Sequence, residues 1–228
     1  MTVTLITGAN KGLGYETARR LIAEGHTVYM GARNSERGAA AASELGGEFV
    51  QLDVTDDESV GNALHRIDER EGRLDVLVNN AGISAVGEVN GPIALEVFDT
   101  NAVGLIRVTQ AALPLLQKSE NPVVVNVSSA LGSFWAVTNP ERRQFHFPSI
   151  VYGASKAAVS MLTVQYAKTW PDMKFNAVEP GFTATDLTPM SSAGQPVEKG
   201  AEVIVRMATI GKDGPTGSFQ ENEDELAW

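Results

Sequence analysis

The feature that most constrains the fold of this chain is a regular alternation of short apolar runs with longer amphipathic segments. Short apolar runs bounded by turn residues favour buried strands, and apolar residues recurring every three or four positions favour helices. Their alternation predicts a parallel sheet, because parallel strands need crossover connections that cover both faces. Right-handed crossovers then lead us to expect an α/β fold: one domain over residues 1–228, with a doubly wound parallel sheet of about seven strands.

The expected strands and helices follow from these patterns. We expect the helix at 92–118 to be irregular near Pro114, because proline removes a backbone donor. Thr55 or Asp56 is the expected N-cap of the helix at 56–71. The expected strands span 2–7, 27–32, 48–52, 74–79, 122–128, 174–179 and 217–219, and the expected helices span 12–24, 35–45, 56–71, 92–118, 149–169 and 197–210.

Charge and composition exclude several function classes. The 18 basic and 28 acidic residues give a net charge of −10, which argues against a nucleic-acid partner because phosphate contacts need a basic face. The chain has no cysteine and three scattered histidines, so we expect no disulfide and no metal site. No predominantly apolar stretch reaches the roughly 20 residues of a membrane span, and the first residues lack the pattern of a secretory signal. We therefore expect a cytoplasmic protein with no membrane partner.

A glycine-rich turn, Thr7-Gly8-Ala9-Asn10-Lys11-Gly12-Leu13-Gly14, joins the first expected strand to the first expected helix. Glycines at such a turn let a pyrophosphate approach the backbone, and the helix start supplies free N–H groups and the positive end of its dipole. A purely structural turn is the alternative. The position between first strand and first helix favours a dinucleotide site.

The end of the second expected strand indicates which dinucleotide binds. A carboxylate there binds the ribose 2′-hydroxyl, whereas an arginine accommodates a 2′-phosphate, and this chain has Arg33. Lys11 could reach the same phosphate, although each cation alone could be an ordinary surface charge. Together they favour NADP, with NADPH preferred over NADH.

Two further strand ends carry polar residues. Asp53 follows the third expected strand and could accept a hydrogen bond from an adenine amino group or help to cap the next helix. Asn79-Asn80-Ala81-Gly82 ends the fourth expected strand. Small residues and amides suit a wall beside a flat ligand, and they equally suit a plain turn.

The segment Tyr152-Gly153-Ala154-Ser155-Lys156 carries the most specific chemistry. Residues four apart on a helix share a face, so the phenol and the ammonium can flank one ligand. A cation about 4 Å away would lower the pKa of Tyr152 and prepare it for proton transfer. An ordinary pair on an exposed helix face is the alternative.

Taken in order, these motifs resemble the short-chain dehydrogenase/reductase family, from residue 2 to about residue 185. Asn10-Lys11-Gly12 and Gly214–Phe219, with Trp228, look like its carbonyl reductase branch. The resemblance implies a Rossmann fold and an NADP(H)-dependent oxidoreductase that transfers a hydride between the nicotinamide and a small carbonyl or secondary alcohol substrate. The alternative is a non-enzymatic NADP(H)-binding sensor, but such proteins usually lose the tyrosine or the lysine, and both are present here.

The resemblance also implies roles for individual residues. Tyr152 would be the general acid in reduction or the base in oxidation, and Lys156 would lower its pKa and bind the nicotinamide ribose. Ser129, rather than Ser128, would orient the substrate carbonyl, and Asn101 would hold a relay water. Asp53 and Asn80 would contact the adenosine half, and Thr183 or Thr185 the nicotinamide carboxamide or the pyrophosphate. The implied cofactor-binding residues are Gly8, Asn10, Lys11, Gly12, Leu13, Arg33, Asp53, Val54, Asn80, Ala81, Gly82, Tyr152, Lys156, Pro180, Gly181, Thr183 and Thr185.

The chain departs from the family pattern in two places. An aromatic-rich insertion at about 134–148 could wall a substrate pocket, cover helix faces used for dimerisation, or be a surface loop without a role. The substrate lid at about 186–196 is short, which suggests an open or shallow pocket shaped also by Ile83, Ser84 and Val86. Family members are often homodimers or homotetramers, but this branch includes monomers, so the oligomeric state stays open.

Overall fold

Seven strands form one sheet in the order β3-β2-β1-β4-β5-β6-β7, counted over residues 1–84, 89–187, 193–222 and 224–228, which the computed structural model describes. Every adjacent pair in this sheet is parallel. The chain winds outward from β1 to β3 and then returns to β4, so the predicted doubly wound sheet is confirmed. The strands are β1 (Val3–Thr7), β2 (Thr27–Ala32), β3 (Glu48–Gln51), β4 (Val76–Asn79), β5 (Val123–Val127), β6 (Lys174–Val178) and β7 (Phe219–Gln220).

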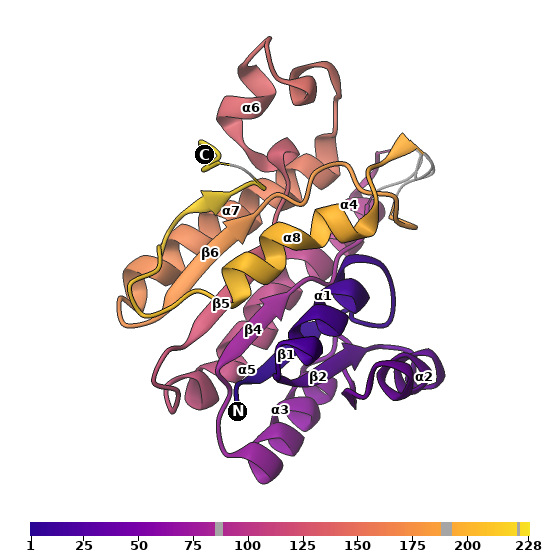
Figure 1. The fold of residues 1–228 in the computed structure, drawn as a ribbon. Helices are drawn as coiled ribbons and strands as arrows, with labels where there is room; N and C mark the ends of the chain where they lie inside the picture. Colours follow the sequence, from indigo (N-terminus) through magenta and orange to yellow (C-terminus); the bar gives the residue numbers. More distant parts are fainter. Residues whose placement is uncertain (85–88, 188–192, 223) are drawn as a thin grey trace.

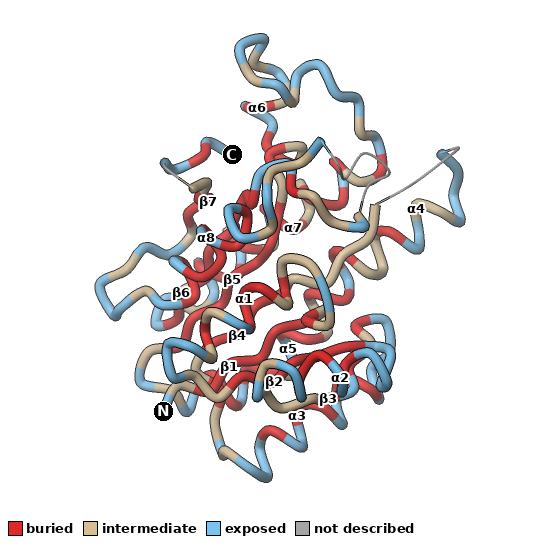
Figure 2. The backbone as a smooth tube through the Cα atoms, turned by 45° about the vertical axis from the view of Figure 1, so that its right-hand side comes forward, coloured by how far each residue is buried: buried red, intermediate tan, exposed pale blue. Residues whose placement is uncertain are grey.

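Helices cover both faces of the sheet (Figure 1). Neighbouring residues of one strand, such as Leu5 and Ile6, point into different apolar layers. Both layers are buried (Figure 2), which explains why the strands are apolar throughout. Within the described part of the chain, no helix has the length and apolarity needed to cross a membrane. One face carries α1 (Gly12–Ala23), α2 (Ser35–Leu45) and α8 (Val197–Ala208), and the other carries α3 (Asp57–Glu71), α5 (Gly104–Leu116) and α7 (Ile150–Thr169).

Local sequence signals set the ends of α2 and α3. The side chains of Asn34 and Asp56 accept hydrogen bonds from backbone N–H groups in the first turns of these helices. Asp56, rather than Thr55, is therefore the N-cap of α3. Gly46 and Gly72 end the two helices in the left-handed conformation that glycine adopts without strain.

The single helix expected at 92–118 is wrong, because three segments share this stretch. They are α4 (Gly91–Phe98), a π-helix (Asp99–Val103) and α5. The irregularity therefore lies in the π-helix and not near Pro114, which lies inside α5. The carbonyl group that loses its donor to Pro114 belongs to exposed Gln110, so water can satisfy it.

The insertion at about 134–148 has secondary structure of its own. It contains α6 (Phe134–Thr138) and a 3₁₀ turn (Arg143–His146), and it projects beyond one end of the sheet (Figure 1). The Trp135 N–H donates a hydrogen bond to the Trp228 carbonyl at 3.1 Å. The insertion and the last residues of the chain are therefore joined, and a role as a pocket wall stays a prediction.

Candidate active site

The carboxyl ends of β1, β4, β5 and β6 meet at one edge of the sheet. The glycine turn follows β1, Asn80 to Gly82 follow β4, Ser128 and Ser129 follow β5, and Pro180-Gly181 follows β6. The strand order reverses between β1 and β4. In doubly wound folds a ligand binds at this reversal, so the topology assembles the sequence motifs where a dinucleotide can reach them.

The glycine turn is held in shape by Asn80. Gly8 and Gly12 have φ values of 65° and 57°, which favour glycine. The Asn80 amide donates hydrogen bonds to the carbonyl groups of Thr7 and Gly8 at 2.9 and 3.2 Å. A Cβ on Gly14 would lie 2.6 Å from the same amide nitrogen. Asn80 therefore supports the turn, and its expected contact with adenosine stays a prediction.

The N-terminus of α1 is suited to an anion. Among the described residues, Lys11 at the N-cap makes no side-chain cap, and the first turn carries no acid. By contrast, α2, α3 and α4 are capped by Asn34, Asp56 and Asn90. Free N–H groups and the helix dipole together favour a phosphate. The glycine turn therefore fits the pyrophosphate of a dinucleotide.

Charged residues follow the neighbouring strands β2 and β3, where the sequence places the ribose of the cofactor. They are Arg33 after β2 and Asp53 after β3. Asp53 accepts hydrogen bonds from the Thr55 N–H at 3.0 Å and the Thr55 hydroxyl at 2.7 Å. Burial opposes ionisation of Asp53, but these bonds and the nearby charge of Arg33 outweigh it and hold the pKa of Asp53 below its ordinary value. Arg33 is exposed, whereas Lys11 forms an exposed ion pair with Asp186 at 3.0 Å.

The two candidate threonines after β6 differ in position. A Cβ on Gly12 would lie 3.4 Å from the Thr185 methyl group, so Thr185 adjoins the glycine turn. Thr183 is buried, and its hydroxyl donates to the carbonyl groups of Pro180 and Gly181 at 3.3 and 3.0 Å. Thr185 is therefore the threonine placed beside the glycine turn. Residues 188–192 of the expected lid, and Val86, lie outside the described residues.

The remaining predicted cofactor residues have different neighbours. A Cβ on Gly200 would lie 2.9 Å from a Leu13 methyl group, so Leu13 packs against α8. Val54 and Ala81 line a small cavity described below. Asn10 is half-buried in the glycine turn.

Lys156 is buried at 4 % exposure on α7. Its Nζ donates a hydrogen bond to the Val127 carbonyl at 2.8 Å and lies 5.6 Å from the centre of the Tyr152 ring. Burial lowers the pKa of Lys156 to about 8, although the negative charge of Glu179 opposes the change. A Cβ on Gly82 would lie 3.5 Å from Nζ, so this glycine leaves room for the ammonium.

The pKa of Tyr152 moves in the direction opposite to the sequence-based expectation. Burial raises it, the negative charge of Glu179 adds to the effect, and a hydrogen bond with Ser129 opposes it. The expected lowering by Lys156 is therefore wrong for this structure, in which desolvation dominates. A phenol that keeps its proton at neutral pH is suited to donate it to a carbonyl oxygen.

The two serines after β5 have different partners. Ser128 is buried, and its hydroxyl donates to the Lys156 carbonyl at 3.1 Å and pairs with the Ser160 hydroxyl at 2.9 Å. Ser129 is half-buried, and its hydroxyl lies close enough to Tyr152 to lower the pKa of the phenol. The structure therefore places Ser129 beside the phenol, whereas Ser128 fastens the end of β5 to α7.

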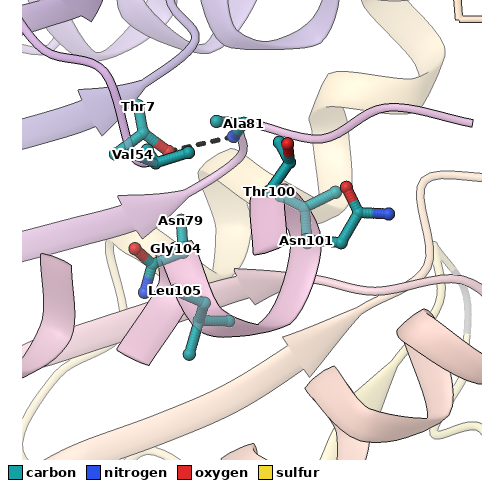
Figure 3. Close-up of a pocket in the computed structure, with 9 residues that line it drawn as sticks. Thr7, Val54, Asn79, Ala81, Thr100, Asn101, Gly104 and Leu105 are labelled. Atoms are coloured by element: carbon teal, nitrogen blue, oxygen red, sulfur yellow. Dashed lines mark hydrogen bonds between the residues drawn. The ribbon is translucent and has the colours of Figure 1, made fainter. Parts of the chain in front are cut away.

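The Asn101 side chain joins three segments. Its Oδ1 accepts the Ile83 N–H at 2.8 Å, and its Nδ2 donates to the Ile83 carbonyl and to Ser155 Oγ, both at 2.9 Å. Both amide hydrogens are therefore used by protein atoms, and Figure 3 shows the amide turned away from Asn79 and Leu105. A role in holding a relay water stays a prediction, with only the second lone pair of Oδ1 available for it.

A small cavity of about 10 Å³ lies between the sheet and the π-helix (Figure 3). Asn79 lines it, and the Asn79 amide nitrogen donates to Thr109 Oγ1 at 3.0 Å and to Asn126 Oδ1 at 2.9 Å. Its Oδ1 is buried and has no hydrogen-bond partner among the described residues. The volume and the unpaired oxygen together fit one buried water molecule.

Sequence reasoning missed two polar residues of this region. Ser155 lies between Tyr152 and Lys156 and bonds Asn101, but serine is common in helices and gave no signal. Glu179 is buried, with its carboxylate accepting from the Ala130 N–H. Its signal was an acid at the end of an apolar strand, directly before Pro180-Gly181.

Comparisons with known proteins agree with this geometry. The family model of short chain dehydrogenases matches residues 2–196. The chain is 33% identical to (−)-isopiperitenone reductase of Mentha piperita over 306 aligned positions, which cover 98% of this chain and 97% of the relative. The structure of salutaridine reductase from Papaver somniferum matches with a TM-score of 0.84 and 28% identity, over 98% of this chain and 100% of that one. NADPH-bound carbonyl reductase from chicken fatty liver matches with a TM-score of 0.86 and 25% identity, over 100% of both chains.

Fold and site together define an oxidoreductase of the class that binds a nicotinamide cofactor and acts on small molecules. The chain belongs to the short-chain dehydrogenase/reductase family. The resemblance to this family and to its carbonyl reductases, predicted from the sequence, is confirmed.

Proposed function

We propose that the protein catalyses NADP(H)-dependent hydride transfer between the nicotinamide and a carbonyl or secondary alcohol substrate. The observation that carries this proposal is the convergence of three groups at one end of the sheet. The Tyr152 phenol lies beside the Ser129 hydroxyl, and the buried Lys156 ammonium lies beside the same ring.

The glycine turn and the uncapped start of α1 would hold the cofactor pyrophosphate, and Thr185 adjoins this position. Arg33 would bind the 2′-phosphate, which favours NADPH over NADH. The match to an NADPH-bound carbonyl reductase supports the same preference. When bound, NADPH supplies the hydride in the reducing direction.

In that direction the residues of this chain position the substrate and supply the proton. The Ser129 hydroxyl donates a hydrogen bond to the substrate carbonyl oxygen and fixes its distance from Tyr152. The carbonyl carbon accepts the hydride, and the carbonyl oxygen takes the phenolic proton. The charge left on the Tyr152 oxygen is stabilised by the Lys156 ammonium, whose effect is large because the site is buried.

Replacement of Tyr152 by phenylalanine tests this function. We expect Tyr152→Phe to lose turnover of ketone or quinone substrates by about 10²-fold or more while it keeps NADPH binding, measured by fluorescence titration. Tyr166→Phe is the matched control, because Tyr166 lies on the same helix and bonds Gln110 instead. An unchanged rate in Tyr152→Phe overturns the proposal. Tight NADPH binding by the native enzyme without turnover of any carbonyl in a broad panel favours the sensor instead.

A further inference from the structure

Glu179 is a buried carboxylate that the proposed reaction does not use. It is 8 % exposed and follows β6. Its Oε2 accepts the Ala130 N–H, and its Oε1 accepts the Gly181 N–H at 3.1 Å. The Ser129 hydroxyl lies beside this carboxylate and lowers its pKa. Glu179 therefore joins the loop after β5 to the loop after β6 at the serine that faces Tyr152.

The Ser129 hydroxyl has three neighbours and only one hydrogen to donate. Its oxygen accepts the Leu131 N–H at 3.2 Å, and the hydroxyl lies beside Tyr152 and Glu179 and lowers the pKa of each. An ionised Glu179 can only accept, so the Ser129 hydrogen must point toward it. A protonated Glu179 can donate to Ser129, which frees the Ser129 hydrogen for the substrate oxygen.

Among the described residues, four ionisable groups face Glu179 from the elements around it. Tyr152 and Lys156 come from α7, Arg142 from the insertion, and Glu221 from the segment after β7. The positive charges of Lys156 and Arg142 favour the ionised carboxylate. Burial, first of all, and the charge of Glu221 raise the pKa of Glu179, whereas its hydrogen bonds lower it.

We propose that Glu179 is a positioning residue that sets the direction of the Ser129 hydroxyl. The neutral carboxyl turns this hydroxyl toward the substrate carbonyl, and the carboxylate withdraws it. This inference rests on the proposed function. Carbonyl reduction should therefore weaken as pH rises through the titration of Glu179.

The test compares two titrations of the full chain saturated with NADPH. One is the kcat of ketone reduction against pH, and the other is the ¹³C signal of the Glu179 carboxyl group in glutamate-labelled protein. We expect kcat to fall about tenfold per pH unit above the midpoint of the Glu179 signal. In Glu179→Gln, checked for folding by circular dichroism, this fall should be lost. The inference is overturned if the two midpoints differ or if Glu179→Gln keeps the same fall.

Glu221→Gln is the matched variant. It tests the inference even if Glu179→Gln does not fold. Glu221 faces Glu179 and pairs with Arg142 at 2.8 Å. Its replacement removes a like charge, so both midpoints should move together to lower pH, with kcat at acid pH unchanged. The inference is contradicted if the midpoint of the Glu179 carboxyl signal moves and the midpoint of the kcat profile does not.

A third measurement separates this inference from the proposed function. Failure of the function shows as turnover retained by Tyr152→Phe or absent from the native enzyme. In that case the ¹³C signal of the Glu179 carboxyl group tests the inference by itself. It is measured in the variant Ser129→Ala. Loss of the Ser129 donor should raise the Glu179 midpoint by roughly one pH unit, and an unchanged midpoint overturns the inference.

Discussion

The Asn101 amide nitrogen lies 2.9 Å from Ser155 Oγ and joins the π-helix to α7. The Ser155 hydroxyl in turn donates to the Tyr152 carbonyl at 2.7 Å. Because the same amide also bonds both backbone groups of Ile83, one side chain fixes the loop after β4 against the helix that carries the phenol. The π-helix therefore sets the geometry of the site as well as the path of the chain.

Ser155→Ala should disturb this connection. It leaves one buried amide hydrogen of Asn101 unpaired, so we expect a loss of about 1–3 kcal/mol in the free energy of unfolding, together with a lower kcat. Urea unfolding and steady-state kinetics measure the two effects. Ser160→Ala on the same helix is the control and should keep kcat, because Ser128 retains its bond to the Lys156 carbonyl. A native kcat in Ser155→Ala would show that the connection does not matter for catalysis.

Gly82→Ala should crowd the Asn101 amide beside Lys156. The added Cβ would lie 3.3 Å from Asn101 Oδ1 and 3.5 Å from Lys156 Nζ. The contact with Lys156 is an ordinary one, but the contact with Asn101 is tight, so we expect the Asn101 amide to shift and kcat to fall about tenfold, equivalent to about 1.4 kcal/mol in the barrier. Gly61→Ala is the control: Gly61 lies in α3 with no described atom within 4 Å of an added Cβ. It should keep activity and gain about 0.5–1 kcal/mol of stability from helix propensity.

Arg33→Asp should weaken NADPH binding far more than NADH binding. A charged contact to the 2′-phosphate contributes about 1.5–3 kcal/mol, and an aspartate would repel the phosphate. Titration with both cofactors measures the difference. Arg66→Asp makes the same charge change at an exposed position of α3 and should affect neither cofactor. Equal weakening of both cofactors in Arg33→Asp would exclude Arg33 as the discriminating residue.

Lys156→Met should raise stability while it abolishes turnover. The pKa of Lys156 is about 8 in the folded chain, against 10.5 for a free lysine. Below pH 8 both states are protonated and the cost of burying the charge is fully present, up to about 3 kcal/mol. Between pH 8 and 10.5 the unfolded chain binds the extra proton, so the native protein gains stability as pH rises and the advantage of the variant disappears.

Thermal unfolding at several pH values measures this window. Lys168→Met is the control, because Lys168 is exposed on the same helix, and surface substitutions change stability by about 0.5 kcal/mol or less. An advantage of Lys156→Met that is independent of pH would show that the buried charge is not its source.

Most of the fold can be predicted from the sequence because helices cover both faces of the sheet, which makes its strands apolar throughout. Apolar runs such as Val123–Val127 can form only buried strands here, and turn residues such as Gly72 mark helix ends locally. The π-helix is not readable, because its cause is distant. Its Asn101 bonds Ile83 and Ser155, which lie in other segments, and neither residue carries a distinctive pattern.

The candidate site divides in the same way. The glycine turn and Tyr152 with Lys156 are local patterns with a chemical meaning of their own. The direction of the Tyr152 pKa is different, since it depends on burial and on Glu179, which follows β6 and is distant in sequence. Charges brought together by topology alone give no local sequence signal.

The bond between Asn80 and Gly8 spans 72 positions of the chain, and this separation bears on the order of folding. During synthesis the ribosome releases the glycine turn long before it releases Asn80, at about 5–20 residues per second. Strand β4 must also pair with β1 before Asn80 reaches the turn. The glycine turn therefore reaches its supported form late in folding. A nascent chain that stops short of β4 contains the complete glycine motif without the hydrogen bonds from Asn80.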